Sequence, residues 1–214
     1  MEQTKTDYVP SPETPHRLLR RAMQLSVFTV AYNILEGVIS IAVGIRAGSI
    51  ALAGFGLDSA VESLSGLIMI WRFSSPLSSE RAERREAAAV KLVGWSFFLF
   101  GLYVLYESVT RLAFRERPEP TLIGIIVAAV STIAMPVLYK LKLDTGRAIG
   151  SRALIADSKE TLACFFLSVS LLTGLGLNYL GGIWWADPAV GLVVAGFLFR
   201  EGYEVLEGED DGGD

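Results

Sequence analysis

Six long apolar blocks divide the chain and leave little sequence between them. A helix needs roughly 20 mostly apolar residues to cross a hydrocarbon core of about 30 Å. Each block is long enough, and a chain with a mean hydropathy of +0.44 and 20% charged residues is too apolar for an ordinary soluble domain. The sequence therefore predicts an all-α, multi-pass integral membrane protein with six transmembrane helices. We place them near residues 23–45, 49–72, 88–111, 120–140, 150–176 and 186–206.

The positions of the Lys and Arg residues predict how the chain is oriented. Fourteen of them fall on one side of the predicted spans and four on the other, with Lys159 left inside a span. Positive side chains concentrate on the cytoplasmic side of membrane proteins. We therefore expect both termini in the cytoplasm, in agreement with an even number of spans. The loop at 140–152, which contains Lys142, is one of the cytoplasmic segments in this count.

The ends of the chain differ in composition from the apolar blocks. We expect a disordered, proline-containing cytoplasmic tail at 1–19, a six-helix transmembrane domain at 20–207 and an acidic disordered tail at 208–214. The net charge of -4 gives no sign of a nucleic-acid surface. The single cysteine, Cys164, excludes an intrachain disulfide.

The second apolar block carries two acids, Asp58 and Glu62, in its middle. Their spacing of four residues places both carboxylates on one face of a helix, one turn apart. An ionisable side chain at the centre of a membrane helix costs about 2.5–3.5 kcal/mol on insertion scales. Two acids on one face of a membrane helix therefore indicate either compensating partners or a functional role.

The fifth block carries a second polar stripe, because Asp157, Glu160, Thr161 and Cys164 stand at i, i+3, i+4 and i+7. The second and fifth blocks run in opposite directions, and Glu160 lies as far from the cytoplasmic edge of its block as Glu62 does, about 15 Å along the helix axis. Helices packed side by side would bring these stripes together near mid-membrane.

Four side chains then become candidate ligands of one ion, namely Asp58, Glu62, Glu160 and Cys164. Converging carboxylates and a thiolate are typical of a divalent-cation site. The alternative for a single buried acid is a hydrogen bond between helices, and the alternative for Cys164 is the role of a small packing residue.

The remaining polar residues of the predicted spans are assigned other roles. Asp157 lies closer to the cytoplasmic mouth, where a water-facing or loading role is expected. Asn33 and Glu36 share a face of the first block. They are expected either to support the ligands or line an access path, or to form hydrogen bonds between helices. Lys159 points away from the stripe of the fifth block and is expected to extend toward the cytoplasm or to neutralise an acid such as Glu36.

Three segments carry a family resemblance: GFGLDSAVES in the second block, ALIADSKETLAC in the fifth and ADPAVGLVVAGFLFREGYEVLEG in the sixth. In this order, over residues 20–207, they resemble the membrane domain of the cation diffusion facilitators, especially short members close to the vertebrate synaptic-vesicle zinc-efflux transmembrane proteins. In that family a D-x-x-x-D pair in span two and an H-x-x-x-D pair in span five form the transport site, and proton entry drives metal export. The resemblance implies that Asp58 and Glu62 form the first pair, and Glu160 and Cys164 the second.

The sequence departs from the family pattern in its ligand types. His16, the one histidine, lies outside every span, and a thiol replaces the last carboxylate. Three carboxylates and a thiol leave zinc, iron, manganese and cobalt open, with zinc as the first expectation. Because the chain ends soon after the sixth block, we also expect it to lack the family's cytoplasmic metal-sensing domain and to form a homodimer through the spans.

The resemblance implies a transporter without enzyme activity, whose partners are a divalent metal ion, protons and the lipid bilayer, and which needs no cofactor beyond the transported ion. Metal ligands must be deprotonated, so one site can exchange a metal ion for protons as it faces each side in turn. Two alternatives stay open at this point. One is a non-transporting membrane scaffold or metal-responsive partner of another protein, and the other is a proton-coupled carrier of a small organic cation.

Overall fold

The computed structural model describes residues 13–47, 50–74, 80–115, 122–181 and 185–210, and over these residues the fold is entirely helical. The prediction of six helices is confirmed. Their bounds are α1 (Glu13–Ala47), α2 (Ile50–Phe73), α3 (Glu80–Phe114), α4 (Leu122–Ile149), α5 (Arg152–Gly181) and α6 (Ala186–Asp210).

Several helices extend beyond the apolar blocks that predicted them. Residues 13–19 and 208–210, expected to be disordered, are helical, while 1–12 and 211–214 lie outside the described residues. The physical reason is that an apolar block marks only the part of a helix that crosses lipid. The backbone hydrogen bonds of the helix continue unchanged into the charged turns beyond that part.

The largest boundary difference concerns the predicted loop at 140–152, because α4 continues to Ile149. Gly150 ends the helix with a φ of 68°, a left-handed conformation that glycine adopts without steric cost. The amide of Ser151 donates to the carbonyl of Gly146 at 2.9 Å, as in a Schellman motif. The Ser151 hydroxyl then accepts from the amide of Leu154 and caps α5. A turn of two residues thus replaces the loop.

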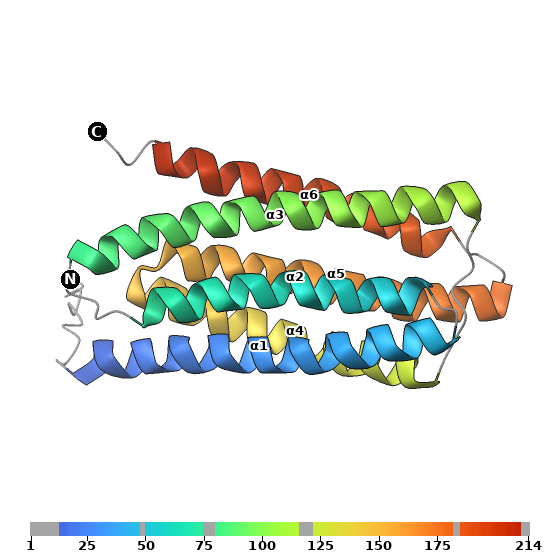
Figure 1. Ribbon diagram of the computed structural model, residues 1–214, viewed down its shortest axis with the longest axis horizontal. Coiled ribbons are helices and arrows are strands. Elements are labelled where there is room, and N and C mark those ends of the chain that lie inside the picture. Colours follow the sequence, from blue (N-terminus) through green and yellow to red (C-terminus); the bar gives the residue numbers. More distant parts are fainter. Residues whose placement is uncertain (1–12, 48–49, 75–79, 116–121, 182–184, 211–214) are drawn as a thin grey trace, which may run out of the picture.

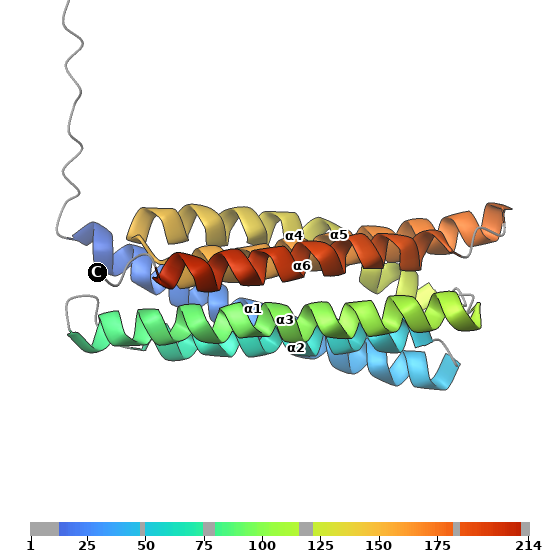
Figure 2. The ribbon, with the colours of Figure 1, turned by 90° about the horizontal axis from the view of Figure 1, so that it is seen from above.

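The helices form two layers of three, which Figures 1 and 2 show from perpendicular directions. One layer holds α1, α2 and α3, and the other holds α4, α5 and α6. Across the layers α1 contacts α4, α2 contacts α5 and α3 contacts α6. α2 and α5 therefore occupy the middle of the bundle, where their polar stripes are shielded by four other helices.

The outer surface of the bundle is apolar. Large side chains such as Leu35, Trp95 and Ile133 are exposed on different helices, as expected of surfaces that face lipid. Within the described residues, α1, α2, α3 and α4 are long and apolar enough to cross a membrane. α1 begins and α6 ends at the same end of the bundle (Figure 1). Six crossings and a cytoplasmic location of both termini remain predictions.

Candidate metal site

The polar stripes of α2 and α5 face each other, as the sequence predicts. The Thr161 hydroxyl of α5 donates to Glu62 Oε1 of α2 at 2.6 Å. The Ser65 hydroxyl, almost one turn along α2, donates to Asp157 Oδ1 of α5 at 2.7 Å. All four side chains are buried, so these hydrogen bonds join the central helices in a region without contact to solvent.

A lysine from α4 enters the same region. Lys142 Nζ lies 2.9 Å from Asp157 Oδ2 and 3.9 Å from Glu62 Oε1, and it donates to Thr161 Oγ1 at 2.8 Å. Its side chain has no exposed surface. The sequence prediction that Lys142 belongs to a cytoplasmic loop is therefore wrong. The α4 helix carries this residue into the bundle, and its ammonium lies among the buried carboxylates.

Glu160 faces a third helix. It accepts a hydrogen bond from the Ser96 hydroxyl of α3 and is completely buried. Asp157 and Glu62 both act electrostatically on its carboxylate, so the three acids share one environment. Their closest polar partners are not identical: Thr161 and Lys142 lie next to Glu62, and Ser96 contacts Glu160.

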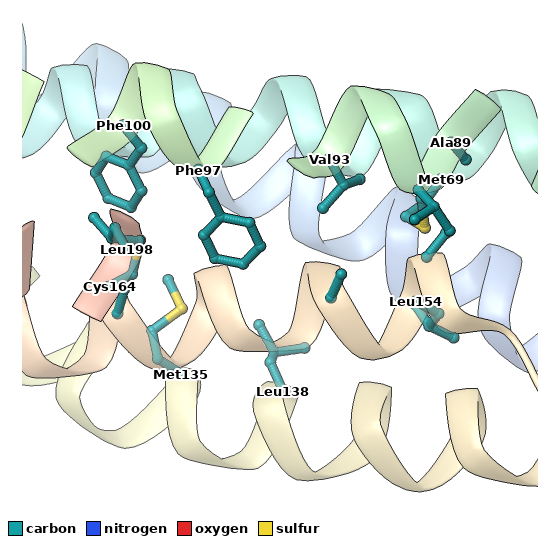
Figure 3. Close-up of a cluster of buried hydrophobic side chains, with 14 of the residues drawn as sticks. Met69, Ala89, Val93, Phe97, Phe100, Met135, Leu138, Leu154, Cys164 and Leu198 are labelled. Atoms are coloured by element: carbon teal, nitrogen blue, oxygen red, sulfur yellow. The ribbon is translucent and has the colours of Figure 1, made fainter. Parts of the chain in front are cut away.

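Cys164 lies in the main hydrophobic cluster, next to this polar region. Figure 3 shows it within the cluster with Met135 of α4 and Leu198 of α6. Its thiol also interacts with Glu62 and lies within electrostatic reach of Asp58. Both interpretations of this residue have support: it fills space among apolar side chains, and it lies beside a candidate ligand.

Asp58 lies one turn from Glu62 along α2, on the side of the Ile50 end of the helix. It is buried and lines a small cavity of about 30 Å³ between α2, α3, α5 and α6. Glu107 and Arg111 of α3 form an ion pair at this cavity, and its wall also includes Leu171 of α5 and Gly191 of α6. Asp58 therefore shares its surroundings with charged groups of α3 as well as with the thiol of α5.

The residues assigned to supporting or access roles are also buried. Asp157 is completely enclosed and paired with Lys142, so it does not face water as expected. Glu36 accepts hydrogen bonds from Tyr32 and Ser131 at Oε1 and from Ser59 at Oε2. Because Ser59 and Ser131 belong to α2 and α4, Glu36 joins three helices.

Asn33 and Lys159 are the remaining polar residues that the sequence analysis named. Among the described residues, no hydrogen-bond partner reaches either polar atom of the buried Asn33 amide. Lys159 forms an ion pair with Glu201 of α6 and does not neutralise Glu36. That pair lies at the rim of the bundle, since a third of the lysine side chain is exposed.

The four predicted ligands are not assembled into one coordination sphere. Over the described parts of the chain, no three side chains of His, Cys, Asp or Glu come close enough to hold one ion. Joint coordination by Asp58, Glu62, Glu160 and Cys164 stays a prediction. Glu62 and Glu160 each keep one oxygen, Oε2, without a well-formed hydrogen bond within these residues.

The sequence analysis missed Lys142 and Ser96 as members of this region. The pattern Met135, Leu138, Lys142, Thr145 places Lys142 on the buried face of α4, because these residues recur every three or four positions. Continuing the helical pattern to Gly150 would have found it. Ser96 gives no such signal, because a serine in a membrane helix most often bonds to its own backbone.

Comparison with known proteins identifies the family. The sequence model of the family of cation efflux transmembrane domains matches residues 26–207. Transmembrane protein 163 of Xenopus laevis is 24% identical over 196 residues, which cover 91% of this chain and 69% of the frog protein. An uncharacterized transporter of Methanocaldococcus jannaschii is 25% identical over 193 residues, covering 87% of this chain and 68% of its own length.

A cadmium, cobalt and zinc/H(+)-K(+) antiporter of Bacillus velezensis is 24% identical over 188 residues, or 85% of this chain and 58% of the antiporter. Together with the apolar helices, these matches make the chain an integral, multi-pass membrane protein. Because the family model spans most of its length, the chain belongs to the cation efflux family.

Proposed function

We propose that this protein exports a divalent transition-metal cation from the cytoplasm in exchange for protons. Metal cation efflux is the activity of the family to which the chain belongs. The proposal adds the ion class, with zinc first and iron, manganese and cobalt as alternatives, and the coupling to protons. It also assigns the ion to Asp58, Glu62, Glu160 and Cys164.

One observation carries the proposal: buried carboxylates gather where α2 meets α5. Glu62 and Glu160 are completely enclosed, yet one oxygen of each lacks a well-formed hydrogen bond among the described residues. A buried charged oxygen without a partner is unfavourable. A cation that these oxygens coordinate would remove that penalty, and the weak thiol donor of Cys164 lies beside Glu62.

The coupling to protons follows from the ligand chemistry. Carboxylates bind a metal ion in their deprotonated form, so binding releases protons and protonation releases the metal. The same groups can thus carry either cargo across the membrane in opposite directions. A relative described as a zinc/H(+)-K(+) antiporter supports such coupling here.

A transport assay tests the proposal. The purified protein is placed in liposomes with a metal-sensitive dye and a pH-sensitive dye, and Zn²⁺, Mn²⁺, Fe²⁺ and Co²⁺ are supplied in turn. We expect metal flux with opposite proton flux, and loss of both in Asp58→Ala and in Glu62→Gln. Glu80→Gln is the matched control, since Glu80 lies exposed at the start of α3. Undiminished flux in either site variant would remove that residue from the mechanism.

A membrane scaffold without transport activity is the second candidate. It is favoured by the structural partners of the acids, because Thr161, Ser65 and Ser96 each donate to one of them. In that case the acids join helices and no ion binds. The absence of bound metal and of flux with all four ions would favour the scaffold.

We further propose that two copies pair through their membrane helices. The supporting feature is the apolar outer surface of α2 and α3, where Leu67, Trp71 and Trp95 line a groove. Light scattering of the detergent-solubilised protein tests this proposal. A mass of two chains supports pairing, and a mass of one chain contradicts it.

A further inference from the structure

The ammonium of Lys142 contacts the same carboxylate that is proposed to bind the transported ion. Its Nζ lies 3.9 Å from Glu62 Oε1 and 2.9 Å from Asp157 Oδ2, and all three side chains are completely buried. We propose that Lys142 is a tethered cation that competes with the metal ion for Glu62 and thereby sets the affinity of the site. This inference rests on the proposed function.

The contacts of Lys142 with Asp157 and with Glu62 differ in distance. Asp157 holds the ammonium at hydrogen-bonding distance, and Thr161 accepts from it at 2.8 Å. Glu62 is a full ångström farther away than Asp157 and receives its hydrogen bond from Thr161. Lys142 can therefore stay with Asp157 while it gives up Glu62. The pairing with Lys142 assigns Asp157 the role of a positioning residue, not that of a ligand.

The charges that face Lys142 come from two helices. Glu62 belongs to α2, and Asp157 and Glu160 belong to α5, while Thr161 contributes a neutral hydroxyl. A lysine presents one positive charge on a flexible four-carbon stem. A dication close to Glu62 repels that charge, and the repulsion is strong because the region is shielded from water. Metal binding to Glu62 and the present position of the ammonium therefore exclude each other.

Such competition suits a transporter, which must release its cargo as well as bind it. While the metal ion is absent from Glu62, the ammonium compensates the negative charge of the carboxylates. As the ion leaves, Lys142 returns to Glu62 and prevents it from binding again. Without the lysine, the site would hold the ion more tightly and release it more slowly.

The test measures the affinity of the full chain for Zn²⁺ and for Mn²⁺ in detergent by isothermal titration calorimetry. Lys142→Met keeps the length of the stem but removes the charge, and it is expected to bind at least about tenfold more tightly. The same variant is expected to transport more slowly at saturating metal. Lys159→Met is the matched control, because it removes a lysine of the bundle that pairs with Glu201 and is expected to leave the affinity unchanged.

A second variant guards against misfolding. Lys142→Met combined with Asp157→Asn removes the buried pair as a unit, so that neither of its members is left without the other. It is also expected to bind metal more tightly than the wild type. If Lys142 only holds α4 against α5, both variants bind with unchanged or lower affinity, which overturns the inference while the proposed function stands. No binding of either ion by the wild type would instead refute the site itself, and the inference with it.

Discussion

Two buried glutamates on neighbouring helices, Glu36 in α1 and Glu62 in α2, lie in contrasting surroundings. Both oxygens of Glu36 accept hydrogen bonds from neutral hydroxyls of three different residues. Glu62 has one such bond, an ammonium at 3.9 Å, and a second oxygen without a well-formed hydrogen bond in the described structure. The comparison shows that burial alone does not identify a binding site. The degree to which neighbours satisfy the carboxylate separates a group that joins helices from one that is available to a ligand.

The largest effect is expected when the ion pair beside Glu62 is broken. Asp157→Ala leaves Lys142 buried without its nearest acid, which costs about 3–5 kcal/mol of stability for a buried pair. Thermal unfolding in detergent, followed by circular dichroism, measures this loss.

The double variant Asp157→Ala with Lys142→Met provides the control, because it removes both charges. We expect it to recover most of the stability. Equal instability of the single and double variants would show that the pair contributes no specific interaction. The contrast with Glu36, whose hydrogen-bond partners are neutral hydroxyls, would then fail.

A smaller effect is expected at the Glu36 cluster. Ser59→Ala removes the hydroxyl that donates to Glu36 Oε2, and hydrogen bonds to charged groups contribute about 1.5–3 kcal/mol. Stability should fall by that amount, while the affinity for Zn²⁺ stays unchanged.

The corresponding change beside Glu62 is Thr161→Val, which removes the donor at 2.6 Å. This variant should alter the metal affinity as well as the stability. If Ser59→Ala changed the affinity as much as Thr161→Val, the two clusters could not be assigned different roles.

The smallest effects are expected at glycines. Gly56 of α2 contacts α1 so closely that an added Cβ would lie 2.9 Å from the carbonyl oxygen of Gly37. Gly56→Ala should therefore separate α1 from α2 and cost about 1–3 kcal/mol, as overpacking does elsewhere. The metal affinity should be preserved, because Glu62 faces α4 and α5.

Gly196 of α6 is the matched control, since nothing lies within 4 Å of its added Cβ. Gly196→Ala is expected to stabilise the helix by about 0.5–1 kcal/mol. A loss of metal binding in Gly56→Ala would indicate that the α1–α2 contact supports the site as well as the fold.

The sequence was sufficient to predict the six helices and to predict that α2 and α5 face each other. Apolar blocks of membrane length located every described helix, and the polar stripes of the second and fifth blocks predicted that α2 and α5 face each other. The hydrogen bond between Thr161 and Glu62 itself was not predicted. Helix ends were less predictable, because hydropathy identifies only the apolar part of a helix and not the polar turns that extend beyond it. The two-residue turn at Gly150 shows this most clearly.

The partners of the acids could not be obtained from the same reasoning. Lys142 lies just beyond the apolar block of α4, so charge counting assigned it to a loop, although its helical register places it on the buried face. Ser96 contacts Glu160 from a helix whose rotation the sequence does not specify. Pairwise contacts of this kind depend on how helices are rotated about their axes, and a periodic pattern determines that rotation only roughly.

The most direct measurement of the central claim is the metal content of the purified protein after equilibration with Zn²⁺ or Mn²⁺ and removal of free ion. We expect about one ion per chain in the wild type and in Glu36→Gln, and none in Glu62→Gln, because a metal ion needs the deprotonated carboxylate. Metal retained by Glu62→Gln, or lost equally from Glu36→Gln, would contradict the assignment of the ion to the meeting point of α2 and α5.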